Sequence, residues 1–497
     1  MVTTAQRPIQ TNLESNRVQD LELILETLTQ KILTYVTKAD SEDGSVGTPQ
    51  TPHNLVKLFN VPEEGQGLQD LFDQVDNILN HSVVTWNKGF MDKLYASTNP
   101  VGIASDLLLS ILNTNSHVFT VSPALTIIEK KTSHEYAKLF GFSSPYSGGL
   151  TFPGGSYSNS TSLTTARSKL YPETKRYGNG SHKFVIFASS HAHYSIEKAA
   201  IFCGFGSDAV IRVSVTKDGR MIPEDLEKKI IQAKENGFTP LYVNATAGTT
   251  VYGTFDDFNA IADIAEKYGL WFHIDGSWGG NIAFSEKYRY KLSGSERANS
   301  ITVNPHKALG VPATCSFLLF PDQRVLQEAN SLQAPYLFHN NFSSEENYDL
   351  ADGTMGCGRR PDAVKLYLGW RWFGTQGYRD RIDYAISLSK YLAEQVLSKN
   401  ELVLVSEFPP PFLQICFYYA PNGVLSEIPN ENTNATRFIA KRLHETGKFL
   451  VDYAPEHGKD SRGEFFRVVV NSPIVTSDSI DELISSILTL GQQYQTR

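Results

Sequence analysis

Hydrophobic residues near the start of the chain recur three or four positions apart. This spacing predicts an amphipathic helix over residues 18–33. Its apolar positions are Val18, Leu21, Leu25, Leu28 and Ile32. The flanking segments 41–52 and 61–67 are rich in Gly, Pro and charged residues, which is typical of loops. We therefore expect residues 1–90 to form an accessory N-terminal helical region.

Strand and helix patterns alternate between about residues 120 and 365. The clearest unit has a strand and loop at 240–250, a helix at 258–268 and a strand at 271–275. Asp256 or Asp257 can cap this helix and Gly269 can end it. Such alternation predicts a mostly parallel α/β sheet, in which ligands bind beyond the carboxyl ends of the strands.

The pattern changes after residue 366. Helical patterns at 363–374 and 382–396 are followed by short strand patterns at 412–420 and 465–472, which predict a smaller α+β domain. The expected division is an accessory segment at 1–90, a large α/β domain at 91–366 and a small C-terminal domain at 367–497.

Composition and charge favour a globular protein with a small-molecule partner. The 497 residues are 41% hydrophobic and 20% charged, with a net charge of −8 and no basic block, which argues against nucleic acid or an anionic membrane as partner. The first twenty residues lack a signal-peptide core and no apolar run approaches the length of a membrane span, so we expect a cytoplasmic protein. The four cysteines lie far apart without a CxxC pair, which predicts neither disulfides nor a zinc site.

The stretch "SITVNPHKALGVP" places Lys307 directly after a strand and before further apolar residues. Desolvation there would lower the pKa of the lysine and free its amine to attack a carbonyl. Asp275 ends another strand of the same sheet and can hold a proton on the ring nitrogen of a heterocycle. Singly, each residue is more often an outward lysine or a satisfied carboxylate. Together they indicate pyridoxal 5'-phosphate (PLP).

Two further segments suit such a cofactor. Residues 152–168, "FPGGSYSNSTSLTTARS", combine a glycine pair, hydroxyls and a helix start, so backbone N–H groups and the helix dipole can receive a phosphate. Residues 189–200, "SSHAHYSIEKAA", carry two histidines at a strand-to-helix junction. A metal site is the weaker interpretation, because no third ligand follows at zinc-like spacing; a histidine stacked on a flat ring fits better.

Four motifs together resemble the group II PLP-dependent amino acid decarboxylases, in particular the branch of animal glutamate decarboxylase and cysteine sulfinate decarboxylase. They are "HAHYSIEKA", "NATAGTTVYGTFD", "WFHIDGSWGG" and "GSERANSITVNPHK". The resemblance covers the chain from about residue 75 to the end. It implies the PLP-dependent fold type I, of the aspartate aminotransferase superfamily, and an obligate homodimer with active sites at the subunit interface.

The resemblance also implies roles for single residues around the cofactor. Lys307 matches the lysine that forms the Schiff base, Asp275 the partner of the pyridine nitrogen, and His193 the ring that stacks on the cofactor. Thr250 matches the position that approaches the phenolic oxygen of the cofactor. The residues that match those around the phosphate are Gly155, Ser156, Asn304 and His306.

Three positions bear on the substrate. Tyr336 matches the tyrosine of a mobile loop that returns a proton to the substrate carbon, and Arg467 matches an arginine that holds the side-chain carboxylate of an acidic substrate. Lys93 replaces a glutamine that touches this carboxylate in the animal enzymes. It is expected either to strengthen recognition of the acid or to shorten the pocket; otherwise it points to solvent or pairs with Asp92.

One departure concerns the ring of the cofactor. The family has two alanines after the aspartate, where this chain has Gly276 and Ser277. The face of the ring opposite His193 is therefore expected to be more polar than usual, which affects how closely the reaction follows that of the animal enzymes.

The expected reaction is PLP-dependent α-decarboxylation of an acidic L-amino acid, with glutamate first and aspartate or cysteine sulfinate next. The alternatives are an oxidative decarboxylation, a carbon–sulfur lyase reaction or a catalytically silent scaffold. The presence of Tyr336 argues against the oxidative reaction. The joint presence of Lys307, Asp275, His193 and Tyr336 argues against a silent scaffold.

Overall fold

A seven-stranded sheet forms the centre of the larger part of the molecule. The computed structural model describes residues 17–332, 347–456 and 461–495. The strands are β2 (Gly148–Phe152), β3 (Phe184–Ser189), β4 (Val210–Val213), β5 (Thr239–Thr246), β6 (Trp271–Gly276), β7 (Ser300–Val303) and β8 (Ser316–Phe320). Their order is β2-β8-β7-β6-β5-β3-β4, and every pairing is parallel except the two made by β8. The predicted, mostly parallel sheet is confirmed.

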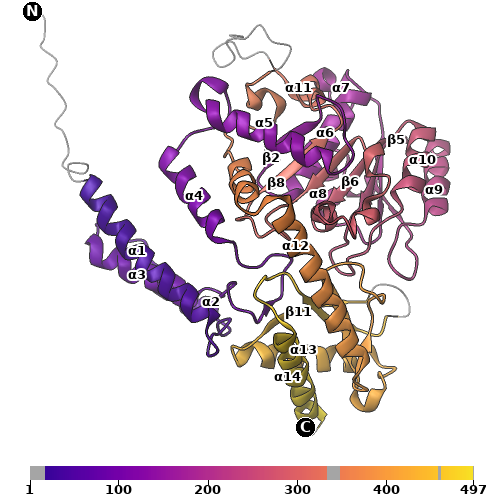
Figure 1. Ribbon diagram of the computed structural model, residues 1–497. Helices are drawn as coiled ribbons and strands as arrows, with labels where there is room; N and C mark the ends of the chain where they lie inside the picture. Colours follow the sequence, from indigo (N-terminus) through magenta and orange to yellow (C-terminus); the bar gives the residue numbers. More distant parts are fainter. Residues whose placement is uncertain (1–16, 333–346, 457–460, 496–497) are drawn as a thin grey trace, which may run out of the picture.

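Helices cover both faces of this sheet (Figure 1). One face packs on α6 (Gly155–Leu170), α8 (Ser195–Phe202) and α11 (Arg324–Asn330). The other packs on α5 (Pro123–Lys138), α9 (Pro223–Glu235) and α10 (Phe258–Tyr268). Successive residues of a strand point to opposite faces, so Phe272 and Ile274 of β6 lie in the second core and Trp271 in the first.

The ends of α10 follow the prediction from sequence. The side chain of Asp257 accepts a hydrogen bond from the backbone N–H of Ala260, which caps the first turn. Gly269 ends the helix in the left-handed region at φ 67°, where a residue without Cβ is favoured. Two other short helices complete this part, α4 (Pro100–Leu112) and α7 (Thr174–Tyr177).

A second, five-stranded sheet forms the smaller part. Its strands are β1 (Phe90–Met91), β9 (Leu402–Leu404), β10 (Gln414–Tyr419), β11 (Leu450–Pro455) and β12 (Glu464–Val469), in the order β1-β11-β12-β10-β9. Only the β1–β11 pairing is parallel. Helices α13 (Pro429–Glu445) and α14 (Ser477–Gln495) pack against this sheet. The register places Asp452 opposite Arg467, a pairing that matters for the site.

Helix α12 (Ala363–Leu397) runs from the larger part to the smaller one (Figure 1). The two helices that the sequence predicted here are both present, and they follow each other directly across a kink, so that α12 spans 35 residues. The only interruption is Gly374, whose φ of 67° is not helical. Because both halves of α12 contribute buried residues to the cores, packing keeps them together. The element crosses residue 366, and the proposed domain boundaries stay predictions.

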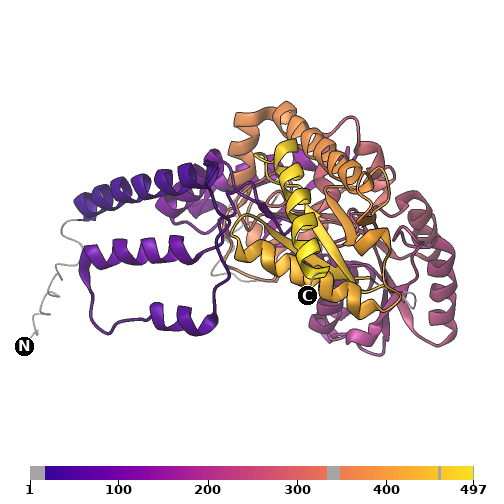
Figure 2. The same cartoon turned by 90° about the horizontal axis from the view of Figure 1, so that it is seen from below.

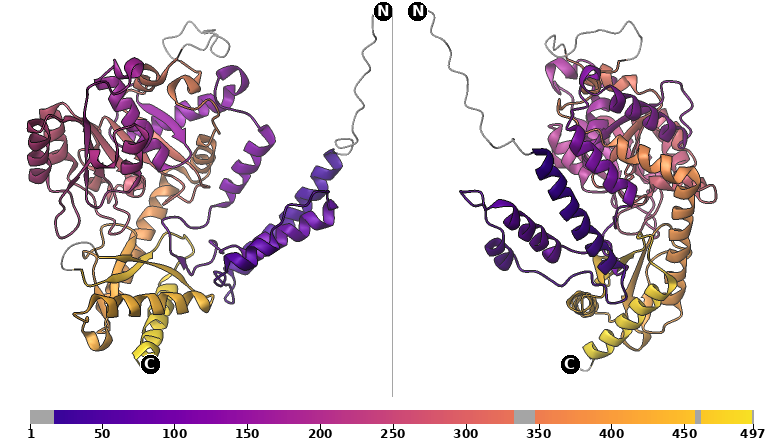
Figure 3. Two further views of the ribbon diagram at one scale, coloured as in Figure 1. Left: turned by 180° about the vertical axis from the view of Figure 1, so that it is seen from behind. Right: turned by 60° about the vertical axis from the view of Figure 1, so that its left-hand side comes forward.

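The N-terminal helices extend away from the rest of the molecule (Figures 2 and 3). They are α1 (Arg17–Asp40), α2 (Pro52–Leu58) and α3 (Gly67–His81). An ion pair from Lys31 to Asp76, 2.6 Å long, joins α1 to α3. Short 3-10 helices span Phe119–Val121, Ser207–Ala209, Gly279–Phe284, Arg289–Leu292, Ser295–Arg297, Leu350–Gly353 and Pro421–Gly423. Within the described ranges, every helix is too short or too polar to cross a membrane.

Candidate active site

The residues predicted to surround a cofactor meet in one cavity of about 180 Å³. It lies beyond the carboxyl ends of β5, β6 and β7, where an open α/β sheet usually binds its ligand. The predicted residues that line it are Gly155, Ser156, His193, Thr250, Asp275, Asn304, His306 and Lys307. Ser277 and Trp278 line it as well. Segments far apart in sequence are thus brought together as the motifs predicted.

Hydrogen bonds hold the backbone of Lys307 in place, and its side chain lines the cavity. Its N–H donates to the carbonyl of Asn304 (3.1 Å), and its carbonyl accepts from Nδ2 of Asn471 (3.1 Å). Burial lowers the pKa of Lys307 although the charge of Asp275 opposes the shift, and the nearby charge of Arg467 lowers it further. A larger fraction of the amine is therefore unprotonated and nucleophilic at neutral pH.

Asp275 is a buried carboxylate at the end of β6. Its Oδ1 accepts a hydrogen bond from the N–H of Ser277 (3.0 Å), and its Oδ2 accepts from Nδ2 of Asn159 (2.9 Å). Burial alone would raise the pKa of Asp275, but the bond from Ser277 and the neighbouring His193 and His273 bring it below its usual value. The group is thus an anion at neutral pH, suited to hold a proton on a ring nitrogen.

A buried network behind Asp275 was not predicted from the sequence. Asn159 turns its Nδ2 to Asp275 and its Oδ1 to Nε2 of His273, 3.1 Å away. Nδ1 of His273 lies 2.8 Å from the hydroxyl of Ser300. Burial lowers the pKa of His273 to about 4, so the ring is neutral and can donate from Nε2. His273 and Asp275 are two residues apart on β6 and share the face that packs on α6. That spacing of two residues was the signal in the sequence from which a role for His273 could have been inferred.

His193 lies in the turn between β3 and α8. Its Nδ1 accepts from the N–H of Ser195 (3.2 Å), and burial lowers its pKa, so the ring is neutral at pH 7. His191 instead stacks on Tyr252 with the ring centroids 5.1 Å apart. The described part of the chain holds no group of three or more His, Cys, Asp or Glu side chains able to bind a metal ion. The geometry is consistent with a stacking role for His193.

The N-terminus of α6 forms the end of the cavity suited to a phosphate. Gly154 precedes the helix at φ 112° and supplies no side-chain cap, so the N–H groups and dipole of the first turn face the cavity side. A Cβ at Gly155 would collide with the hydroxyl of Ser277 and lie 3.0 Å from Nδ2 of Asn304. The buried Oδ1 of Asn304 has no hydrogen-bond partner among the described residues.

His306 adds a neutral ring beside this phosphate end. Its Nδ1 lies 2.7 Å from the carbonyl oxygen of Cys315, and burial lowers its pKa to about 4. The cavity thus offers an amine, a carboxylate, a neutral ring and a helix N-terminus in one space. This donor set fits the carbonyl, pyridine nitrogen and phosphate of PLP.

Comparison with known proteins decides the family. Residues 52–420 match the model described as the pyridoxal-dependent decarboxylase conserved domain. The chain belongs to the pyridoxal-dependent decarboxylase family. It is 44% identical to the L-aspartate decarboxylase dtxS4 of Metarhizium robertsii, over 96% of this chain and 98% of that protein. The protein is therefore a PLP-dependent carboxy-lyase.

Solved structures give the same fold. Mouse CSAD is 32% identical, with a TM-score of 0.89 over 95% of this chain and 98% of that one. Oryza sativa TDC, solved with PLP and tryptamine, has a TM-score of 0.87 over 98% of this chain and 99% of its own, at 23% identity. The similarity to the Oryza sativa protein supports the fold alone. Fold type I, predicted from the motifs, is confirmed.

At the other end of the decarboxylase site, Arg467 is buried on β12. Its Nη1 donates to the carbonyl of Thr250 (3.1 Å), and Thr250 lines the cofactor cavity. Its Nη2 donates to the carbonyl of Asp92 (3.2 Å) and pairs with Asp452 at 2.6 Å. The guanidinium thus lies next to the cavity, where the sequence placed the partner of an acidic side chain.

Lys93 does not line the cavity of the decarboxylase. Its Nζ lies 2.8 Å from Asp452 and 3.2 Å from Asp92, and its side chain is 46% exposed. The pairing with Asp92, which the sequence left open, is observed; Asp452 is a further partner that the sequence did not indicate. Tyr336 lies outside the described residues, and its part in catalysis stays a prediction.

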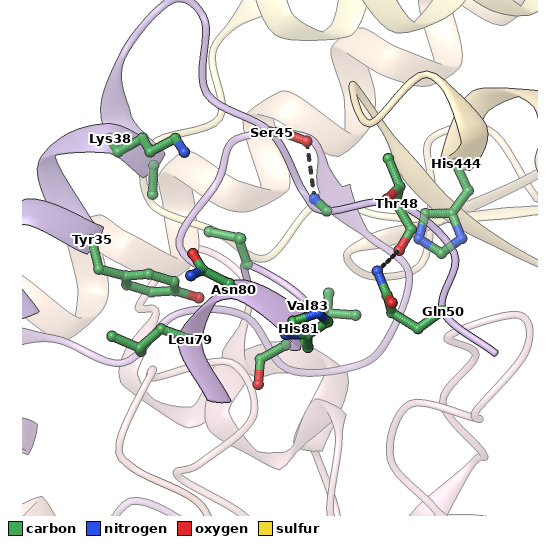
Figure 4. A pocket seen from close by; sticks show the side chains of 14 residues that line it. Tyr35, Lys38, Ser45, Thr48, Gln50, Leu79, Asn80, His81, Val83 and His444 are labelled. Atoms are coloured by element: carbon green, nitrogen blue, oxygen red, sulfur yellow. Dashed lines mark hydrogen bonds between the residues drawn. The ribbon is translucent and has the colours of Figure 1, made fainter. Parts of the chain in front are cut away.

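A second cavity, of about 360 Å³, lies between the N-terminal helices and α13 (Figure 4). Tyr35, Lys38 and Asn80 border it on one side and His444 on the other. Ser45 and Gln50 at its edge bond to backbone groups of their own loop. Its lining contains none of the residues predicted to bind the cofactor or substrate.

Proposed function

We propose that this decarboxylase removes the α-carboxylate of a short acidic L-amino acid, with L-aspartate first, and releases CO2 and the corresponding amine. The observation that carries the proposal is the buried guanidinium of Arg467 next to the cofactor cavity. A buried cation of this kind suits a carboxylate ligand. The sequence alone put glutamate first. The similarity to an L-aspartate decarboxylase and to mouse CSAD, a cysteine sulfinate decarboxylase, favours the shorter acids.

The residues proposed to hold PLP are those of the cavity. Lys307 forms the covalent link, Asp275 keeps the ring nitrogen protonated, and His193 packs on the ring. Gly155, Ser156, Asn304 and His306, together with the first turn of α6, hold the phosphate. When bound, PLP supplies the sink for the electron pair left on the α-carbon as CO2 departs.

The other residues position the substrate and control protons. Arg467 binds the distal carboxylate and so fixes which α-carbon bond faces the cofactor. Asp275 maintains the positive charge that makes loss of CO2 favourable, and Asn159 and His273 hold Asp275 in place. Tyr336 is proposed to return a proton to the α-carbon. Exclusion of water from this space protects the reaction from misdirected protonation.

The test of the proposed function is the release of CO2 from aspartate, cysteine sulfinate, glutamate and aromatic amino acids by the purified holoenzyme. We expect kcat/KM for the best acidic substrate to exceed that for aromatic ones by at least about 10²-fold, because an apolar side chain would leave the buried Nε of Arg467 without a hydrogen-bond partner. Arg467→Met, close in length but uncharged, should remove this preference. Preference for aromatic substrates in the wild type would refute the proposal, and an aldehyde product would indicate the oxidative alternative.

We further propose a homodimer, supported by apolar residues left exposed on the described surface. Helix α4 exposes Ile103, Leu107, Leu108, Ile111 and Leu112, and α1 exposes Val18, Leu21, Leu23, Ile32 and Leu33. The N-terminal helices α1 to α3 extend from the body (Figure 3). Several large apolar side chains left exposed on one helix are typical of an interface.

The expected state is a dimer of 55.3 kDa chains in sedimentation equilibrium. Ile111→Glu should weaken it by at least about tenfold in Kd, because a charge would be buried in the apolar contact. The matched control is Ile428→Glu, on the small part of the molecule, since Ile428 and Ile111 are exposed to 57% and 58%. A wild type that stays monomeric at micromolar concentration would contradict the proposal.

A further inference from the structure

Asp452 lies between Lys93 and Arg467, the two cations at the end of the site proposed to bind the distal carboxylate of the substrate. Its Oδ2 accepts from Nη2 of Arg467 at 2.6 Å and from Nζ of Lys93 at 2.8 Å. Sheet pairing puts the three together: Asp452 on β11 is opposite Arg467 on β12, and Lys93 follows β1, which pairs with β11 through Met91 and Val451. One carboxylate oxygen therefore holds both cations.

Arg467 is fixed in one position by three hydrogen bonds, which use three of the five N–H groups of its guanidinium. Nη1 is bonded to the carbonyl of Thr250, and Nη2 to Asp452 and the carbonyl of Asp92. Nε is buried and has no hydrogen-bond partner among the described residues. The side chain is 8% exposed. A buried N–H of a charged group without a partner is energetically costly. A ligand oxygen that accepts a hydrogen bond from Nε would therefore be strongly stabilised.

The charges around Arg467 balance within the chain. Two cations, Lys93 and Arg467, face two carboxylates, Asp92 and Asp452. Burial opposes the charge of Lys93, but its bond to Asp452 and the charge of Asp92 raise its pKa, so it stays protonated. The surroundings of Arg467 therefore carry no net positive charge that would attract an acidic substrate. Discrimination between acids of different length then depends on where the remaining N–H donors of Arg467 lie rather than on general attraction.

We propose that Asp452 sets the length of the acidic side chain that the decarboxylase accepts. By occupying Nη2 of Arg467 and Nζ of Lys93, it holds the guanidinium still and restricts the distal acid to the remaining N–H groups of Nε and Nη1, which favours aspartate over the longer glutamate. Asp452 acts through Arg467 and is a positioning residue. The inference rests on the proposed function, because it assumes an acidic substrate.

The experiment compares kcat/KM for aspartate and for glutamate in the wild type, Asp452→Asn, Lys93→Gln and the double variant. Asp452→Asn keeps the size but releases both cations, so we expect the aspartate-to-glutamate ratio to fall at least about tenfold, the scale of one methylene in a specific pocket. The change should come mainly from a lower KM for glutamate. Lys93→Gln should lower the ratio at least about threefold. The double variant should equal Asp452→Asn, because Lys93 acts through Asp452.

The matched control is Glu464→Gln. Glu464 lies on the same strand as Arg467 and forms a two-bond ion pair with Arg437, at 2.6 and 2.7 Å, away from the cavity. Its loss should leave the substrate ratio unchanged. Calorimetric titration of the holoenzyme with succinate and with glutarate gives a readout without turnover, in which Asp452→Asn should bind glutarate relatively more tightly than the wild type does.

The outcomes separate the two proposals. A wild type that decarboxylates no acidic amino acid refutes the proposed function, and one that prefers glutamate refutes both the choice of aspartate and the role of Asp452. A wild type that prefers aspartate, with an Asp452→Asn ratio within about twofold of it, refutes the role of Asp452 alone. If Asp452→Asn does not fold, Lys93→Gln decides, since its side chain is half-exposed; an unchanged ratio there overturns the inference.

Discussion

Lys307→Ala is expected to abolish both decarboxylation and the covalent attachment of PLP. Lys307 is the lysine of the cavity, and its lowered pKa makes the amine available to the carbonyl of the cofactor. Turnover should fall by at least about 10³-fold, on the scale of losing a group that acts directly on the reacting atoms. The wild-type protein should absorb visible light, and after borohydride reduction a peptide containing Lys307 should carry the added mass of the cofactor.

A second lysine provides the matched control. Burial also lowers the pKa of Lys291, whose Nζ donates to the carbonyl of Pro411 outside the cavity. Lys291→Ala should therefore keep the visible band and the turnover. A Lys307→Ala protein that still carries the reducible visible band would contradict the assignment, as would a labelled peptide without Lys307.

The lowered pKa of Lys307 has a consequence for pH. The amine reacts only when unprotonated, so uptake of PLP by the apoprotein should become faster as pH rises. It should level off above the pKa of Lys307. Because burial favours the neutral amine, the midpoint should lie below the ordinary lysine value of about 10.4. Stopped-flow absorbance across pH would measure it, and a midpoint at or above the ordinary value would contradict the burial argument.

Asp275→Asn is the second change with a large expected effect. It removes the anion proposed to face the ring nitrogen but keeps the shape, so PLP should still bind to Lys307 while kcat falls by about 10²- to 10³-fold, the scale of losing one preorganised electrostatic contact. The visible band should shift because the ring nitrogen loses its proton. Steady-state kinetics and the spectrum of the same sample measure both effects.

Asn159→Ala should have a smaller effect on kcat than Asp275→Asn and so provides an intermediate variant for comparison. It removes one of the two hydrogen bonds to Asp275 and leaves that from Ser277. Its kcat should fall between those of the wild type and Asp275→Asn, with PLP still bound. An Asp275→Asn enzyme with wild-type kcat would show that the carboxylate does not control the ring nitrogen.

Local sequence rules predicted the elements that position the cofactor. The capped helix α10 and the strands ending at Asp275 and before Lys307 follow from periodicity and turn residues, which act over a few positions. They also predicted the two helical stretches of α12, which meet at a kink at Gly374. They did not predict that the two helices follow each other directly, because this depends on the packing of both halves on the cores, which a short sequence window does not encode.

The sequence by itself determined the decarboxylase motifs, the lysine and aspartate at two strand ends and the phosphate-binding turn, because parallel strands bring their carboxyl ends to one edge of the sheet. Only the tertiary structure decided what surrounds them. Asn159 meets Asp275 because α6 packs on that face of β6, and Asp452 joins Lys93 to Arg467 because three strands pair in one register. Those contacts link residues up to 359 positions apart, and no local pattern predicts them.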